Sequence, residues 1–286
     1  MTDASTDLTE QVLASFAGTP DDRLRAILDS VIRHLHEAVR EVEPTNAEWE
    51  RAIDFLTRTG QKCTDVRQEF ILLSDVLGVS MLLETINGQA SPDATESTVL
   101  GPFHLVRSPP LPNGAQIDLV GRPERCVVTG RVLSTTGTPL GGATVDVWQA
   151  DDNGFYDVQQ PDVQPAGNGR GLLTTDADGT FWFRTVMPRY YPIPVDGPVG
   201  GLLTATRRHP YRPAHIHFIA TASGHKPLTT HIFVADSEYL DSDAVFAVKD
   251  SLVRPFDVVT DADQAARWST TAPLRHASVE LVLQPM

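Results

Sequence analysis

The pattern of hydrophobic and polar positions changes character near residue 90. Before that point, apolar residues recur every three or four positions, which is the spacing of one face of an α-helix. The clearest run comprises Leu24, Ile27, Leu28, Val31, Ile32, Leu35 and Val39. The first third of the chain is therefore predicted to be helical.

Start and stop signals divide this helical part. Thr19 followed by Pro20 predicts an N-cap and a proline in the first helical position. Thr45 and Glu48 form a capping-box pattern, and Gly60 is a suitable C-terminal stop. A third helix is expected from Thr64 to Thr85. Because it is apolar on most sides, we expect it to be buried against other helices or a partner subunit.

After a loop-like segment, residues 87–98, short stretches rich in β-branched residues alternate with turns. The predicted strands are residues 127–133, 143–148, 180–186, 215–221, 229–234 and 279–283. Many short strands with frequent turns are typical of a β-sandwich. The expected class is α+β. An all-helical, dimerising part (residues 1–98) precedes a β-sandwich catalytic domain (residues 99–286).

Charge and composition narrow the possible partners. The formal net charge of −14 argues against a nucleic acid or an anionic membrane surface, since both require a basic face. No apolar run reaches the roughly 18 residues of a membrane span, and the polar start lacks a signal-peptide pattern. The two cysteines lie far apart in sequence and indicate no disulfide framework, so a cytoplasmic location is expected.

Candidate chemistry begins with His215 and His217. Side chains two residues apart on a strand point to the same side, so these imidazoles form half of a possible metal site. Ile216 and Phe218 then face the opposite layer. Two histidines on a solvated strand face explain the pair equally well.

The chain has five tyrosines, and two of them occupy a stiff, proline-rich segment, residues 187–198. These are Tyr190 and Tyr191, and Tyr156 follows a predicted strand. Taken singly, each is explained as well by ordinary packing. Two phenolates with two imidazoles would form a hard, anionic ligand set that favours Fe(III) over Zn(II) or Cu(I).

Several motifs together resemble the intradiol ring-cleavage dioxygenases, and the likeness extends into the N-terminal helices. They are Gly101–Phe103, Val147–Asp151, Gly154–Asp157, Pro192–Pro198, Arg212–Phe218 and Leu228–His231. The resemblance implies one Fe(III) per subunit, with Tyr156, Tyr191, His215 and His217 as ligands. It selects Tyr191 over Tyr190 by its spacing from the Asp-Gly-Pro motif, and makes Tyr191 the ligand that substrate displaces.

Two further residues have expected roles near the metal. Arg212 is three positions before His215, so its charge can stabilise an activated substrate; a structural ion pair is the alternative. His231 is expected to orient a ligand or the displaced tyrosine.

Within the family, the sequence is most similar to hydroxyquinol 1,2-dioxygenases, through Leu72 and Asp75. The resemblance implies further pocket residues: Val99, Gly101, Pro102, Phe103, Ile193, Pro194 and Val245. Asp75 is expected to accept a hydrogen bond from the third hydroxyl of hydroxyquinol. Val195 and Leu100 depart from the pattern of relatives, which affects selectivity but not the metal.

The resemblance implies cleavage of a small aromatic diol or triol with O₂, here hydroxyquinol to 3-hydroxy-cis,cis-muconate and maleylacetate. It also implies a homodimer through the N-terminal helices, which can hold a phospholipid. The alternatives are cleavage of catechol or a chlorocatechol, a zinc hydrolase, and a non-catalytic transthyretin-like binding module. The last would not need two tyrosines and two histidines converging on one point.

Overall fold

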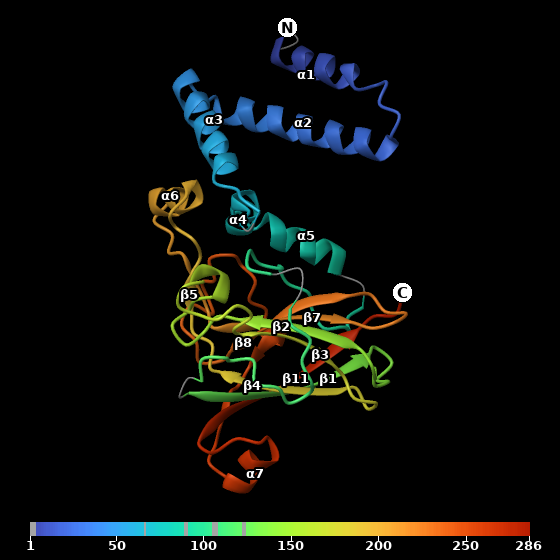
Figure 1. The fold of residues 1–286 in the computed structure, drawn as a ribbon. Helices are drawn as coiled ribbons and strands as arrows, with labels where there is room; N and C mark the ends of the chain where they lie inside the picture. Colours follow the sequence, from blue (N-terminus) through green and yellow to red (C-terminus); the bar gives the residue numbers. More distant parts are fainter. Residues whose placement is uncertain (1–3, 66, 89–90, 105–107, 122–123) are drawn as a thin grey trace. The chain divides into compact units, whose positions relative to one another are not determined.

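A computed structural model describes residues 4–65, 67–88, 91–104, 108–121 and 124–286 (Figure 1). The chain divides into two compact units, Met1–Arg58 and Thr59–Met286. Helices that follow residue 58 therefore belong to the same unit as the strands. In the described part of the chain, no helix is long and apolar enough to cross a membrane.

The first unit is helical. Its elements are α1 (Ala4–Ser15), α2 (Asp22–Val42) and α3 (Asn46–Gln61), which runs across the division. The predicted N-cap Thr19 is wrong, because Asp21 caps α2 and accepts from the backbone of Arg23 and Leu24. The predicted capping box is confirmed: the Thr45 N–H donates to the Glu48 carboxylate at 2.8 Å, and the Glu48 N–H donates to the Thr45 hydroxyl at 3.3 Å.

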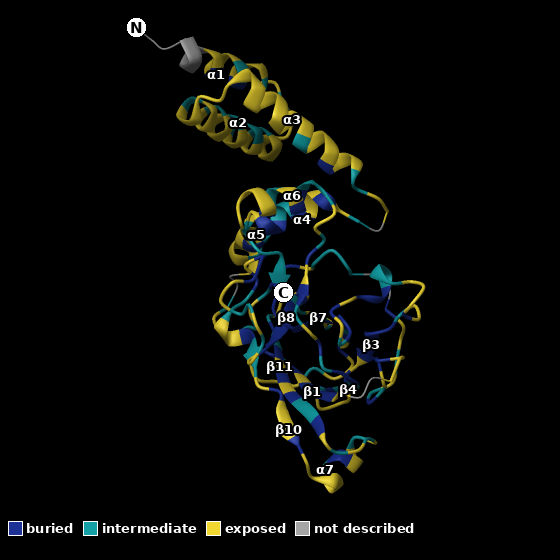
Figure 2. Cartoon of the chain, turned by 90° about the vertical axis from the view of Figure 1, so that its left-hand side faces the viewer, coloured by how far each residue is buried: buried dark blue, intermediate teal, exposed yellow. Residues whose placement is uncertain are grey.

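Helix α2 leaves its apolar face open to solvent. None of its residues is buried, and Figure 2 shows mostly exposed positions along α1, α2 and α3. The repeating apolar side chains of α2 are 44–59% exposed: Leu24, Ile27, Val31, Leu35 and Val39. The helical pattern is thus confirmed, but its apolar stripe is not covered by the other helices of the first unit.

The second unit begins with two short helices where one was predicted. Helices α4 (Glu69–Val76) and α5 (Val79–Gly88) separate at Gly78, whose φ of +73° is readily adopted only by glycine. The expected burial holds on one face, which includes Leu72 and Val76. The other face is exposed in the single chain, so its burial against a partner subunit stays a prediction; it carries Phe70, Ile71, Leu77, Val79, Leu82 and Leu83.

Two sheets form the sandwich (Figure 1). In spatial order, the first contains β10 (Asp257–Val259), β11 (Leu274–Leu283), β1 (Arg125–Ser134) and β4 (Thr180–Val186). The second contains β3 (Arg170–Thr174), β2 (Thr144–Gln149), β7 (His215–Thr221), β8 (Leu228–Val234) and β9 (Val253–Arg254). All six predicted strands are present, and the α+β class with a C-terminal sandwich is confirmed.

The core lies between the sheets and explains the direction of the histidines. Alternate residues of both sheets fill it, among them Val128, Val145, Phe181, Phe183, Ile216 and Phe218. Since Ile216 and Phe218 point inward from β7, His215 and His217 point to the outer side of the same sheet. The remaining elements are η1 (Asp157–Gln159), β5 (Tyr191–Pro192), α6 (Pro198–Ala205), β6 (Tyr211–Arg212), η2 (Asp250–Leu252) and α7 (Ala262–Arg267).

Candidate metal centre

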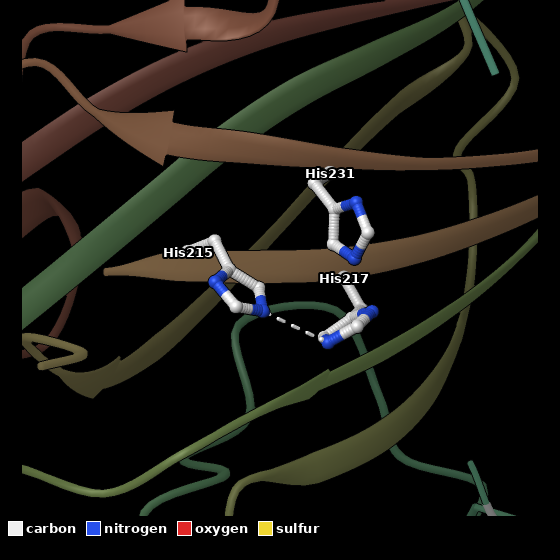
Figure 3. Close-up of side chains that lie close together, drawn as sticks. All are labelled: His215, His217 and His231. Atoms are coloured by element: carbon white, nitrogen blue, oxygen red, sulfur yellow. Dashed lines mark hydrogen bonds between the residues drawn. The ribbon is translucent and has the colours of Figure 1, made fainter. Parts of the chain in front are cut away.

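Three buried histidines converge on the outer side of the five-stranded sheet. His215 and His217 come from β7 and His231 from the neighbouring strand β8, where it is the register partner of His217. Figure 3 shows the three rings close together, with Nε2 of His215 3.1 Å from Nε2 of His217. Nδ1 of His231 is hydrogen-bonded to the Thr98 hydroxyl. Imidazole nitrogens gathered in this way can coordinate a cation.

Two phenols complete the group. The Tyr156 hydroxyl lies 3.0 Å from Nε2 of His217 and 3.3 Å from the Tyr191 hydroxyl. Gly154 allows the two tyrosine segments to approach, because a Cβ there would lie 3.0 Å from Cβ of Tyr191. Tyr190 turns elsewhere, and its ring contacts Tyr239 with centroids 5.3 Å apart.

The spacing of these donors fits a single ion. Atoms bound about 2.0–2.1 Å from one metal lie roughly 2.9–3.4 Å from their neighbours. The three contacts that link His215, His217, Tyr156 and Tyr191 span 3.0–3.3 Å. The donor atoms of the histidine trio that includes His231 all lie within 4.8 Å of one another, so this trio gathers at the same point. The three contacts of the two-tyrosine, two-histidine set fit a single ion.

Burial sets the protonation of the group. Desolvation lowers the pKa values of His215 and His217 well below the usual value, so both imidazoles are neutral and offer lone pairs. Nδ1 of His215 lies 2.7 Å from the Pro213 carbonyl, which fixes its proton there and frees Nε2. Desolvation raises the pKa values of Tyr156 and Tyr191, so only a bound cation would convert them to phenolates.

A buried arginine lies beside the imidazoles, as its sequence position predicts. Nη1 of Arg212 is 3.1 Å from Nε2 of His215. The rest of the guanidinium donates to Asp243, at 3.1 Å from Nε and 3.3 Å from Nη2. Burial opposes the charge of Arg212, but the combined effects of Asp243, Tyr191 and Tyr156 outweigh it and the pKa is raised. The predicted alternative, a structural ion pair, is therefore confirmed, and the guanidinium also faces the imidazoles; its action on a substrate stays a prediction.

A cavity of about 410 Å³ opens next to these donors. Four predicted pocket residues line it: Leu72, Pro102, Phe103 and Pro194. The Phe103 ring stacks on Tyr156 with centroids 4.7 Å apart. Gly101 packs against His217, because a Cβ at this position would lie 3.1 Å from Cε1 of that ring. The cavity thus has apolar walls near the candidate centre and also charged groups, Arg67, Glu69 and Asp196.

Comparison with known proteins identifies the class. Residues 112–284 match the family described as Dioxygenase, and residues 21–95 match that described as Catechol dioxygenase N terminus. The chain belongs to the intradiol ring-cleavage dioxygenases. It is 56% identical over 256 residues to a hydroxyquinol 1,2-dioxygenase of Rhizobium sp. (strain MTP-10005), covering 90% of this chain and 87% of the relative.

Two further relatives agree. A 6-chlorohydroxyquinol 1,2-dioxygenase of Cupriavidus pinatubonensis is 51% identical, over 89% of this chain and 92% of the relative. The crystal structure of hydroxyquinol 1,2-dioxygenase from Pseudomonas putida DLL-E4 superimposes with a TM-score of 0.91 and 46% identity, covering 99% of each chain. The chain is therefore an enzyme of this family, and a metal cofactor is expected at the group of donors.

The other predicted pocket residues of the dioxygenase lie deeper. Val99, Ile193 and Val245 pack with Leu72 in one buried apolar cluster. Asp75 is also buried, and desolvation raises its pKa against the opposing effects of a Ser80 hydrogen bond and the charge of Arg212. The described residues that line the 410 Å³ cavity do not include Val99, Ile193, Val245 or Asp75.

Some site residues of the dioxygenase escaped the sequence analysis. Asp243 had no local pattern, although an aspartate partner for a buried Arg212 was a reasonable expectation. Trp148 stacks on His217 at 4.5 Å, and only its place in a strand marked it. A larger hollow of about 540 Å³ is lined by Arg207, Arg208, Asp243 and other residues, and none of the predicted pocket residues lines it. Size alone would therefore not have selected the cavity that four of them line.

Proposed function

We propose that this dioxygenase cleaves the ring of hydroxyquinol (1,2,4-trihydroxybenzene) with O₂, giving 3-hydroxy-cis,cis-muconate and then maleylacetate. The proposed ligands of one Fe(III) per subunit are Tyr156, Tyr191, His215 and His217. The observation that carries the proposal is the set of contacts of 3.0–3.3 Å between their donor atoms. The substrate named for the most similar relatives supports hydroxyquinol.

The donor set supports iron as the metal. Two phenolates and two neutral imidazoles are hard, anionic ligands that suit a trivalent cation better than Zn(II). When bound, ferric iron supplies the Lewis acidity and electron-accepting character that allow a chelated diol to react with O₂. His231 is proposed to support the set from β8, since its Nδ1 is already bonded to Thr98.

Proton transfer falls to Tyr191. A catechol-type substrate must lose two protons to chelate a metal with both hydroxyls. Tyr191, the proposed ligand that substrate would displace, would accept one of them at its hydroxyl oxygen, and the other would pass to solvent. Arg212 is the register partner of Tyr191 across β5 and β6, and its positive charge favours anionic forms of both tyrosine and substrate. Tyr156 is proposed to remain bound throughout.

Substrate recognition is proposed to combine flat walls with one buried acid. Phe103, Pro102 and Pro194 enclose an aromatic ring from the cavity side, and Gly101 leaves space beside His217. Leu72 and Asp75 are on the inward face of α4, with Asp75 in the electrostatic field of Arg212. Asp75 is proposed to accept a hydrogen bond from the third hydroxyl, which catechol lacks. Val99, Ile193 and Val245 support this wall from behind.

Steady-state oxygen uptake tests the substrate. With iron-loaded protein, kcat/KM should be highest for hydroxyquinol and much lower for catechol and 4-chlorocatechol. Faster turnover of catechol would replace hydroxyquinol by catechol as the substrate. No uptake with any of them, in a protein that retains iron, would contradict the proposed activity altogether.

The assembly proposed is a homodimer through the N-terminal helices. The exposed apolar stripe of α2 supports it, because a surface of this kind on a helix is normally covered. A phospholipid acyl chain is proposed as a further occupant of that apolar interface. Analytical ultracentrifugation tests the dimer, with Val31→Glu expected to give monomers, and mass spectrometry of an organic extract tests the lipid.

Cys63 and Cys126 are both free thiols, which supports the proposed cytoplasmic location.

A further inference from the structure

A second buried arginine lies near the candidate centre, where its charge acts on Tyr156 and His217. Arg170 on β3 is 1% exposed. Its Nε donates to Asp157 at 2.8 Å, and its Nη2 donates to the backbone carbonyl of Phe103 at 2.8 Å. The other carboxylate oxygen of Asp157 accepts from the Gly167 N–H at 2.9 Å. One guanidinium thus joins three segments that are distant in sequence.

Two of these segments carry site residues. Asp157 directly follows Tyr156, a proposed iron ligand, and Phe103 is a wall of the substrate cavity. The rings of Phe103 and Tyr156 stack with centroids 4.7 Å apart and planes inclined by 27°. Because Arg170 holds the backbone behind both rings, it fixes the distance between them.

Stability alone does not account for this arginine. Nη1 of Arg170 is buried and has no hydrogen-bond partner among the described residues, and a buried donor that stays unpaired costs free energy. A buried ion pair is itself weak evidence of stabilisation, since desolvation offsets the attraction between the charges. Buried groups that remain unsatisfied therefore call for a specific explanation.

The site thus has two buried arginine–aspartate pairs. Arg212 pairs with Asp243 next to Tyr191, and Arg170 pairs with Asp157 next to Tyr156. In each case an aspartate offsets the charge of the arginine. The remaining contribution of Arg170 is then geometric, and only its forked donors reach two acceptors at once.

We propose that Arg170 is a positioning residue that sets the gap between Phe103 and Tyr156, and with it the fit of an aromatic ring in the cavity. The inference rests on the proposed function, because it takes the ring to be that of a catechol-type substrate. It assigns to Arg170 an effect on binding rather than on the chemical step.

The decisive comparison is Arg170→Lys against Arg184→Lys. Lysine keeps the charge and can pair with Asp157, but it cannot also hold the Phe103 carbonyl. Arg184 on β4 is the matched control, since it too bonds two loop carbonyls, Gly114 at 3.0 Å and Ser269 at 2.8 Å, away from the cavity. The readouts are KM and kcat for hydroxyquinol, and the Kd of the chromophoric probe 4-nitrocatechol measured without turnover.

In Arg170→Lys, KM and Kd should rise about tenfold while kcat changes less than about threefold, as expected for a lost interaction that acts on binding. Arg184→Lys should leave all three constants within about twofold of the wild type. Unchanged KM and Kd in Arg170→Lys, or an equal rise in Arg184→Lys, would overturn the inference.

Asp157→Asn provides a second route if the lysine variant does not fold. It retains Arg170 and the bond to Phe103 but weakens the anchor on the Tyr156 side, so Kd for 4-nitrocatechol should again rise. An unchanged Kd in this variant would likewise overturn the inference. The proposed function would be contradicted if the wild-type protein bound 4-nitrocatechol but consumed no O₂ with hydroxyquinol. The same comparison of Kd values would then still test the effect of Arg170 on ring binding.

Discussion

Arg212 and Asp243 form an ion pair in which each side chain is only 2% exposed. The carboxylate accepts from Nε of the guanidinium at 3.1 Å and from Nη2 at 3.3 Å. The third nitrogen, Nη1, faces His215. Asp243 also accepts from the backbone N–H groups of Val245 and Ala247. The carboxylate therefore fixes both the arginine and the loop that carries a predicted pocket residue.

Asp243→Ala should destabilise the protein and impair turnover. Removing one partner leaves the charge of Arg212 buried without compensation, and we expect the free energy of unfolding to fall by about 3–5 kcal/mol. Urea denaturation measures this, and kcat should fall in the fraction that remains folded. Asp54→Ala is the control, since its pair with Arg58 is exposed and should contribute no more than about 0.5 kcal/mol. Equal effects of the two substitutions would contradict the account.

Asp75→Ala should change substrate preference. The third hydroxyl of hydroxyquinol would lose its carboxyl partner, so kcat/KM for hydroxyquinol should fall about 10–100-fold. Catechol has no hydroxyl at that position, and its kcat/KM should change much less. Oxygen uptake with both substrates gives the ratio. A parallel loss for both would show that Asp75 acts on the structure of the site rather than on selectivity.

Asp75 also predicts a dependence of stability on pH. Burial raises the pKa of its carboxyl in the folded protein above the ordinary 3.8. Folding thus favours the neutral carboxyl. Its contribution to the free energy of unfolding is complete below the pKa of Asp75 in the unfolded protein, and it is lost as pH rises through the pKa in the folded protein. Asp75→Asn lacks this loss, so wild type should become less stable relative to the variant as pH increases. Urea denaturation of metal-free protein across this range measures the difference, and a pH-independent difference would contradict the raised pKa.

Gly197→Ala should destabilise the wall of the cavity. A Cβ at Gly197 would lie 2.2 Å from Oε1 of Glu69, a buried carboxylate that also accepts from the Val199 N–H at 3.3 Å. We expect a loss of about 1–3 kcal/mol. Gly201→Ala is the control on the same helix, α6, where a Cβ meets nothing within 4 Å and should stabilise the helix by about 0.5–1 kcal/mol. Thermal unfolding distinguishes the two, and equal effects would refute the close contact.

The sandwich and half of the candidate centre could be predicted from local patterns. Strand β7 has the predicted bounds, and its two-residue period alone places His215 and His217 on one side. The helical period also identified α2, because its apolar stripe is regular whether or not anything covers it. The hydrophobic pattern did not predict the break between α4 and α5 at Gly78, because the apolar run continues in sequence where the backbone turns.

The rest depended on contacts between distant segments. Tyr156 and Tyr191 meet only because Gly154 permits a close approach, and no local pattern reports which of two adjacent tyrosines turns inward. Tyr190 turns instead toward Tyr211 and Tyr239. The preference for Tyr191 therefore came from resemblance to a family, and the geometry supplies the physical reason for it.

The most direct measurement of the central hypothesis is the visible absorption spectrum of iron-loaded protein with single tyrosine variants. Phenolate bound to ferric iron absorbs in the visible by charge transfer, so the wild type should be coloured. Tyr156→Phe and Tyr191→Phe should each weaken the band and turnover, whereas Tyr190→Phe should preserve both. A colourless protein that retains iron, or a band lost in Tyr190→Phe and kept in Tyr191→Phe, would contradict the proposed centre.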